Sequence, residues 1–157
     1  MIQNKKTKKG FTLIEILVVI GIIAILAAVV LVAINPARQF AQARDSQRNS
    51  NLNAILNAIG QRIADNKGIF SGQGIDGKTC PALPNSATNI DNAAGGSGID
   101  LSCLVPTYLS ALPIDPSNPT SPNTGYQVYQ DTNSRVHVLA PVTEPNIPRT
   151  APIEIVR

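Results

Sequence analysis

The chain has 157 residues, with 13 Lys+Arg, 10 Asp+Glu and a formal net charge of +3, a length that suits one modest domain with appendages. Four of the lysines lie in the first ten residues, and from Phe11 onward nine basic residues face ten acidic ones. This distribution argues against a nucleic-acid partner, because a nucleic-acid-binding domain needs a basic patch in its folded part.

An apolar run follows the lysine-rich head. It extends from Phe11 to Ile34, and its only strongly polar residues are Thr12 and Glu15. A helix of this length reaches about 36 Å, enough to span a bilayer. Because positive charge stays on the cytoplasmic side, the head should remain in the cytoplasm and the rest of the chain should be exported.

Three kinds of segment could explain this run: a secretory signal peptide, an ordinary membrane anchor, and a membrane helix in which Glu15 has a function. A secretory signal peptide has a shorter apolar core, and a cleavage site after Ala33 would place Leu31 where a small residue is wanted. An ordinary membrane anchor explains the length but not Glu15, since a carboxylate within the membrane costs about 2.5–3.5 kcal/mol. The run supplies no Lys, Arg or His as a partner, so Glu15 is a candidate functional residue.

The start of the run resembles a known processing signal. Lysines precede Gly10-Phe11-Thr12-Leu13-Ile14-Glu15, and about twenty apolar residues follow. This order is similar to the type III signal of type IV pilins and type II secretion pseudopilins. The resemblance implies that a prepilin peptidase removes residues 1–10 by cutting after Gly10 and methylates Phe11. It also implies that Glu15 pairs with the N-terminal amine of a neighbouring subunit.

The resemblance also implies a function. It implies a non-enzymatic subunit of a helical filament, a homo-oligomer assembled through residues 11–34 by machinery in the inner membrane. Before assembly the subunit would cross the cytoplasmic membrane once, in contact with lipid and with its C-terminal domain outside. Afterwards it would belong to a cell-surface pilus or a periplasmic pseudopilus. The alternative is a singly anchored extracytoplasmic binding domain that does not polymerise, which needs neither Gly10 nor Glu15.

Residues 35–67 are expected to continue the helix in amphipathic form. Pro36 favours a kink or a break, because proline removes a backbone hydrogen bond, and Gly68 is a stop signal. An apolar stripe follows one helix face and consists of Leu52, Ile55, Leu56, Ile59 and Ile63. Polar positions off that stripe are Arg44, Arg48, Asn51 and Asn57. Arg38, Arg44 and Arg48 are better explained as the surface of a juxtamembrane helix than as a nucleic-acid site.

Residues 68–104 are rich in Gly, Asn, Asp and Ser and are expected to form loops. Cys80 and Cys103 form no CxxC pair, so a metal site is not expected. Outside the membrane they predict one disulfide, with two free thiols as the alternative. A GxGxxG spacing begins at Gly72, but a dinucleotide site needs a following helix, which Cys80-Pro81 does not open.

The C-terminal part changes to a period of two. Pro113, Pro116, Pro119 and Pro122 recur every third residue and predict a stiff extended surface loop. Residues 125–130 and 135–140 alternate around a turn at 131–134, and 153–156 can add a third strand. The predicted fold is therefore α+β and pilin-like: a long N-terminal helix whose outer half packs on a small antiparallel sheet within residues 68–157.

A second, weaker resemblance involves residues 108–126. Tyr108-Leu109, Leu112-Pro113, Asp115-Pro116 and Gly125-Tyr126 are similar to a segment of major pseudopilins, but Ser117-Asn118 replaces the usual Trp-Gly. Those proteins carry calcium in this region. The oxygen donors here are sparse, and calcium wants six to eight of them, so no cofactor is expected. The sparse candidates are Asp115, Asn118, Asn123 and Asp131.

Overall fold

A computed structural model describes residues 10–117, 122–145, 147–148 and 151–157 of the chain. The leader lysines, Asn118 and Pro119 lie outside these residues, so the predictions made for them stay predictions. The chain divides into two compact units, Met1–Ala37 and Arg38–Arg157. Each unit is described by itself.

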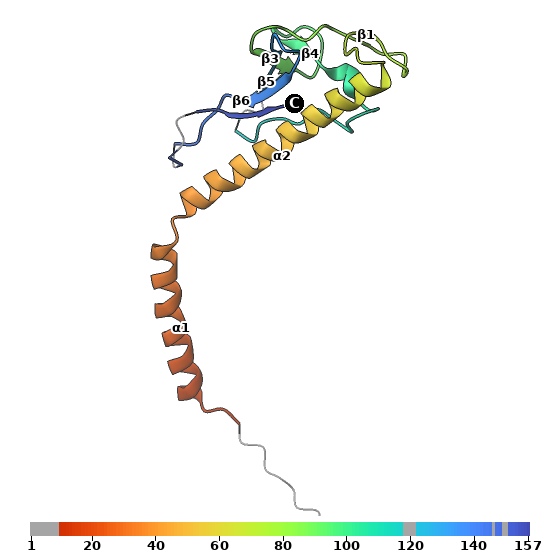
Figure 1. Cartoon of the computed structure of the whole chain (residues 1–157). Helices are drawn as coiled ribbons and strands as arrows, with labels where there is room; N and C mark the ends of the chain where they lie inside the picture. Colours follow the sequence, from red (N-terminus) through yellow and green to blue (C-terminus); the bar gives the residue numbers. More distant parts are fainter. Residues whose placement is uncertain (1–9, 118–121, 146, 149–150) are drawn as a thin grey trace, which may run out of the picture. The chain divides into compact units, whose positions relative to one another are not determined.

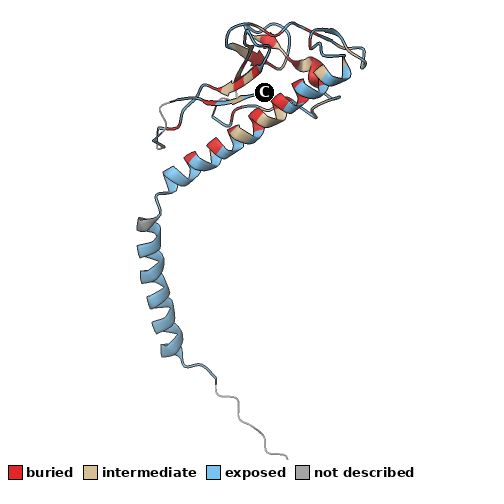
Figure 2. Ribbon diagram, viewed as in Figure 1, coloured by how far each residue is buried: buried red, intermediate tan, exposed pale blue. Residues whose placement is uncertain are grey.

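The first unit is built around helix α1, Leu13–Ala33 (Figure 1). None of the side chains described in α1 is buried, and Figure 2 shows the helix exposed all round. Among the described residues, Leu13–Val32 is long and apolar enough to cross a membrane, with a mean hydropathy of 3.2. This is the helix predicted from the apolar run. An all-round apolar helix needs lipid or other helices as its surroundings.

Helix α2, Pro36–Asp65, begins after Ile34-Asn35. The helical stretch is therefore interrupted where a kink or break was predicted. Proline fits the first position of the new helix, because the N–H it lacks would have no partner there. At the other end Gly68 has a φ of +90°, and its N–H donates to the carbonyl of Ile63 at 2.8 Å. Glycine adopts this backbone conformation without a steric penalty, as the predicted stop requires.

The second unit contains a five-stranded sheet in the order β4-β3-β5-β6-β7. Its strands are β3 (Thr88–Asp91), β4 (Ile99–Asp100), β5 (Asn123–Gln130), β6 (Val136–Ala140) and β7 (Ile153–Val156). The predicted hairpin is β5–β6, and the predicted third strand is β7, antiparallel to β6. The α+β prediction is confirmed. The sheet is mixed and not purely antiparallel, because β3 and β4 run parallel.

Strand β3 lies in a segment that was predicted to be loop. Its four residues, TNID, give a mixed signal, because Thr and Ile favour strands whereas Asn and Asp disfavour them. They become a strand because β5 provides an antiparallel partner, with Thr88 opposite Val128 and Asn89 opposite Gln127. Pairing with a distant segment, and not local sequence, makes this strand.

The core lies between α2 and the sheet. Leu52, Ile55, Leu56 and Ile59 of the predicted stripe are buried, and Ile63 packs against the same cluster. The sheet and the adjoining loops supply the opposite side, with Ile90, Leu101, Leu104, Tyr126, Val128 and Val138 all fully buried. Two positions predicted to be off the stripe, Arg48 and Asn51, are also buried. The buried face of α2 is therefore wider than its apolar residues indicate.

Cys80 and Cys103 form the predicted disulfide, with Cα atoms 5.5 Å apart. The bond joins β2 (Thr79–Cys80) of a two-stranded sheet to the short 3₁₀ helix η1 (Ser102–Leu104). The partner of β2 is β1, Gly72–Gln73. Two loop segments with little apolar content are thereby fixed against the core.

Replacing both Cys80 and Cys103 with alanine should lower the free energy of unfolding of the second unit by about 3 kcal/mol, since the bond restricts the unfolded chain. Chemical unfolding of the full chain in detergent, followed by near-ultraviolet circular dichroism of its tyrosines, measures this loss. Membrane insertion should be unchanged, because α1 contains neither cysteine. Alkylation of both thiols in correctly exported wild-type protein would contradict the expectation.

Candidate functional site

The sequence singled out Gly10, Phe11 and Glu15, which lie at the start of α1. Thr12 is the N-cap of this helix and forms a capping box with Glu15. The backbone N–H of Glu15 donates to Thr12 Oγ1 at 3.3 Å. In return, Glu15 Oε2 accepts from the Thr12 N–H at 2.8 Å and from the Thr12 hydroxyl at 2.9 Å. The helix thus begins two residues after the predicted cleavage site.

This geometry adds a partner of Glu15 that the sequence analysis did not name. The run supplies no Lys, Arg or His as a partner for Glu15, as the sequence analysis stated, but two hydrogen bonds from the neutral Thr12 reach its carboxylate. Both bonds end on Oε2, and Oε1 takes part in neither. A capping box satisfies backbone donors but supplies no positive charge. The carboxylate can therefore hold the helix start with one oxygen and receive a cation with the other.

The surroundings of Glu15 are apolar and open. Phe11 is 84% exposed and Leu13 is 82% exposed. In the described part of the chain, Glu15 is the only charged residue before Arg38. A cation for Glu15 within the apolar layer must therefore come from outside α1, or from a new amine created by cleavage at Gly10.

A second charged cluster lies in the soluble unit around Arg48. The Arg48 side chain is fully buried and binds Asp115 with two hydrogen bonds, Nε to Oδ2 at 2.6 Å and Nη2 to Oδ1 at 3.1 Å. Its Nη1 donates to Asp45 at 3.0 Å and to Glu144 at 2.7 Å. Arg44 also donates to Glu144, at 2.8 and 2.5 Å. We call these five residues the Arg48 cluster.

The interpretation of Arg38, Arg44 and Arg48 as a helix surface is wrong for Arg48, which is fully buried, whereas Arg38 is exposed and Arg44 is partly exposed. The hydrogen bonds to Asp115 are the main cause that raises the pKa of the Arg48 guanidinium above its ordinary value. The pKa of Glu144 falls to about 2, chiefly because of its bonds from Arg44, with Arg48 contributing further. The two arginines are matched by three carboxylates, so they form no basic patch. The cluster joins α2 to two distant loops.

The same contacts bear on the calcium candidates. Asp115 is bound to Arg48 and also accepts from the Ser117 N–H at 2.8 Å. Asn123 Oδ1 accepts from the Gly125 N–H at 2.8 Å. Asp131 Oδ1 accepts from the N–H groups of the β5–β6 turn. No group of three or more His, Cys, Asp or Glu residues that could hold a metal ion occurs in the described ranges.

The GxGxxG segment contains a further match that went unrecognised in the sequence. Gly72 to Thr79 also has the G-x-x-x-x-G-K-T spacing of a phosphate-binding loop. Such a loop connects a strand to a helix and points its N–H groups at the phosphates. Here β1 and β2 pair across the loop as a hairpin, and the Lys78 ammonium binds the carbonyl of Val105. The fold therefore lacks the strand-to-helix context of the motif.

The N–H groups of this loop bind within the protein. Four of them donate to internal acceptors: Gly74 to Lys78 O, Ile75 to Asn66 Oδ1, Gly77 to Gly74 O and Lys78 to Asp76 Oδ1. Arg62, fully buried, donates to the carbonyls of Phe70, Gly72 and Lys78 at 2.8–3.0 Å. A buried guanidinium thus organises the loop through its carbonyls, which is the opposite of a phosphate cradle.

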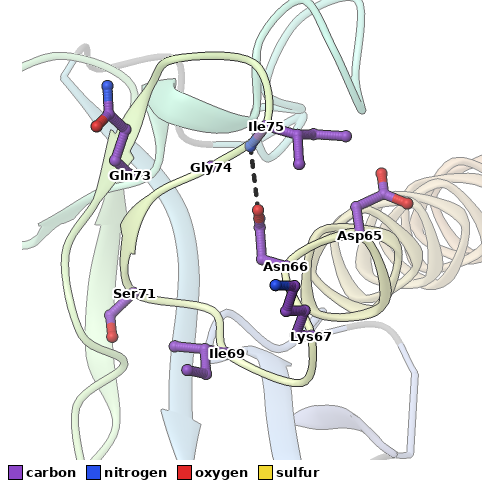
Figure 3. Close-up of a pocket in the computed structure, with 8 residues that line it drawn as sticks. All are labelled: Asp65, Asn66, Lys67, Ile69, Ser71, Gln73, Gly74 and Ile75. Atoms are coloured by element: carbon purple, nitrogen blue, oxygen red, sulfur yellow. Dashed lines mark hydrogen bonds between the residues drawn. The ribbon is translucent and has the colours of Figure 1, made fainter.

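A pocket of about 320 Å³ lies beside this loop, at the C-terminal end of α2 (Figure 3). Asn66 crosses it to bind the Ile75 N–H at 3.1 Å. The remaining lining is of mixed character: Asp65, Lys67, Ile69, Ser71, Gln73 and Gly74. The pocket contains both charge signs and two exposed isoleucines, and its central amide is used to hold the loop.

Comparison with known proteins bears on the N-terminal segment. Residues 5–31 match the model of the prokaryotic N-terminal methylation motif, the leader signal of type IV pilins and pseudopilins. The match contains Gly10, Phe11 and Glu15 and most of α1. No curated protein and no solved structure shows significant similarity to the chain.

Proposed function

We propose that the chain is a structural subunit of a type IV pilus-like helical filament, either a pilin or a type II secretion pseudopilin. The observation that carries the proposal is Glu15, the fifth residue after Gly10, at the start of an apolar helix that is exposed on every side. An anchor alone has no need of this carboxylate. A filament does, because the carboxylate selects one offset between neighbouring helices.

The chemistry of that selection follows from the capping box. Cleavage after Gly10 gives Phe11 a new ammonium group. This group lies close to the level of the Glu15 carboxylates in a bundle of such helices. An ammonium and a carboxylate removed from water together cost far less than either one alone. Within one chain, Oε2 of Glu15 is held by Thr12. The Phe11 amine of a neighbouring subunit can then bind Oε1 while the hydrogen bonds of the capping box stay in place.

The proposal assigns partners and location. The methylation motif implies processing by a prepilin peptidase, and assembly would follow from machinery in the same membrane. Before assembly α1 crosses the cytoplasmic membrane once, with the second unit outside. After assembly the chain is part of a cell-surface or periplasmic filament. The role is non-enzymatic and requires no cofactor.

The mature protein should begin at a methylated Phe11, because the peptidase that recognises this motif cuts after Gly10 and modifies the new terminus. N-terminal sequencing and mass spectrometry of membrane and filament fractions measure both changes. In a Gly10→Leu variant the precursor should stay uncut while still inserting through α1. A mature chain that starts at Met1, or near Ile34, would contradict the proposal and favour the anchored binding domain.

A further inference from the structure

One large apolar side chain is exposed on the first turns of α2. Phe40 is 66% exposed, whereas the next residue, Ala41, is fully buried. Among the residues that the structure describes, the other large apolar side chains exposed in the second unit are Ile69, Ile75, Ile114, Val142 and Val156, and none is aromatic. Phe40 is therefore the only exposed aromatic ring in the described part of this unit.

Chain connectivity limits where Phe40 can be. The apolar span ends at Val32, and Leu13–Val32 as a helix covers about 30 Å, the thickness of the hydrocarbon layer. Pro36 follows Ala33 by three residues, which reach at most about 11 Å at any angle between the helices. The start of α2 is thus held within or next to the headgroup layer whenever α1 is in a bilayer.

The direction of helical side chains brings the Phe40 ring closer still. In an α-helix each Cα–Cβ bond tilts toward the N-terminus, so a side chain covers the turn that precedes it. The ring of Phe40 therefore covers the turn that begins at Pro36. Its reach is toward the N-terminal end of α2.

We propose that the Phe40 ring inserts into the headgroup layer of the membrane that holds α1, and anchors the first turn of α2 to that surface before assembly. The proposal rests on the membrane anchoring stated under Proposed function. Phe is one of the residues that helices lying at a membrane surface bury at the boundary between headgroups and acyl chains.

The size of the patch favours lipid over a second copy of the chain. A stable protein–protein interface buries about 800 Å² on each partner. On the first turns of α2 the other exposed residues are polar or small, apart from the proline that begins the helix: Pro36, Ala37, Arg38, Gln39, Gln42, Ala43 and Ser46. One ring among such residues is too small a patch for that kind of interface, whereas burial of a ring at the boundary between headgroups and acyl chains needs no matching protein surface.

The chain contains no tryptophan, so Phe40→Trp creates a single fluorophore at the site. The full chain carrying this change would be placed in phosphatidylcholine vesicles whose acyl chains carry bromine close to the headgroup. The matched control is Ile75→Trp, also exposed and also within the second unit. Ile75 lies far from the start of α2. Its backbone N–H binds Asn66, and Asn66 follows Phe40 by 26 positions, which is about 39 Å along a helix.

Bromolipid should quench the fluorescence of the Phe40→Trp variant at least twofold more strongly than that of the Ile75→Trp variant. The emission of the Phe40→Trp variant should also shift to shorter wavelength. Flotation of both variants with the vesicles tests the membrane anchoring separately. If both float and are quenched equally, the inference is overturned while the anchoring stands. Shielding of the Phe40→Trp fluorophore only in assembled filaments would also overturn it, and would point to a contact between copies.

Discussion

Replacing Arg48 with methionine should lower the free energy of unfolding of the second unit by about 3–5 kcal/mol, the range for breaking a buried ion pair. Arg48 is fully buried, and its partners Asp115, Glu144 and Asp45 are almost as inaccessible to water. Methionine fills similar space but removes the charge that these carboxylates face. Denaturant unfolding of the full chain in detergent, followed by tyrosine circular dichroism, measures the loss.

Arg44→Met is the matched control. Arg44 also binds Glu144, but its side chain is 36% exposed, so water can replace much of what is lost. The effect should be clearly smaller than for Arg48→Met. Adding Asp115→Leu to Arg48→Met should restore part of the stability, because an apolar pair replaces the stranded carboxylate. Equal losses for the two single variants would contradict a special role for the buried arginine.

The Arg48 cluster also predicts an acid response. Arg44 and Arg48 lower the pKa of Glu144 from its usual 4.5 to about 2. A carboxylate with a lowered folded pKa contributes stability that is present above its unfolded pKa and is lost as the pH falls through the folded pKa. Stability should therefore decline between pH 4.5 and about 2, and Glu144→Gln should flatten this part of the profile.

Replacing Glu15 with leucine should reduce filament assembly at least tenfold when the variant is the only copy present, while insertion and cleavage continue. The carboxylate is the only charge on α1. Contacts between apolar helix faces do not select one offset between neighbouring helices as the carboxylate does. The measurement is the ratio of assembled to membrane-held protein, with methylated Phe11 verified in each fraction.

Glu15→Gln separates the two roles that the structure gives to this side chain. Glutamine can still accept from the Thr12 N–H and keep the capping box, because Glu and Gln both serve at this position. It cannot neutralise a neighbouring ammonium. If the charge matters, the Glu15→Gln and Glu15→Leu variants should assemble equally poorly. If the cap alone matters, Glu15→Gln should assemble like the wild type.

Coexpression gives a further test of the pairing. A Glu15→Leu subunit keeps its own Phe11 amine, so it should enter filaments beside wild-type subunits and serve their carboxylates. Filaments at wild-type levels from Glu15→Leu alone would contradict the pairing and leave the carboxylate with only a capping role.

The sequence by itself determined the features that depend on local pattern. Gly10 to Glu15 predicted the methylation motif, because a short signal is carried by neighbouring residues. The apolar run predicted α1, the stripe from Leu52 to Ile59 predicted the buried face of α2, and period-two alternation predicted β5 and β6. Helix and strand periodicity are local properties, so these elements could be predicted without knowing what packs on them.

Only the tertiary structure decided the features that depend on distant partners. Strand β3 exists because β5 pairs with it, and its four residues, two favouring strands and two disfavouring them, do not predict it. Arg48 is polar in sequence yet fully buried, because Asp115 and Glu144 are brought to it from 67 and 96 residues away. The Gly72–Thr79 segment matches a phosphate-binding loop in spacing, but Arg62 organises it through its carbonyls. In each case the deciding contact comes from outside the segment itself, so a local pattern cannot reveal which group compensates for the burial of a charge or of backbone polar atoms.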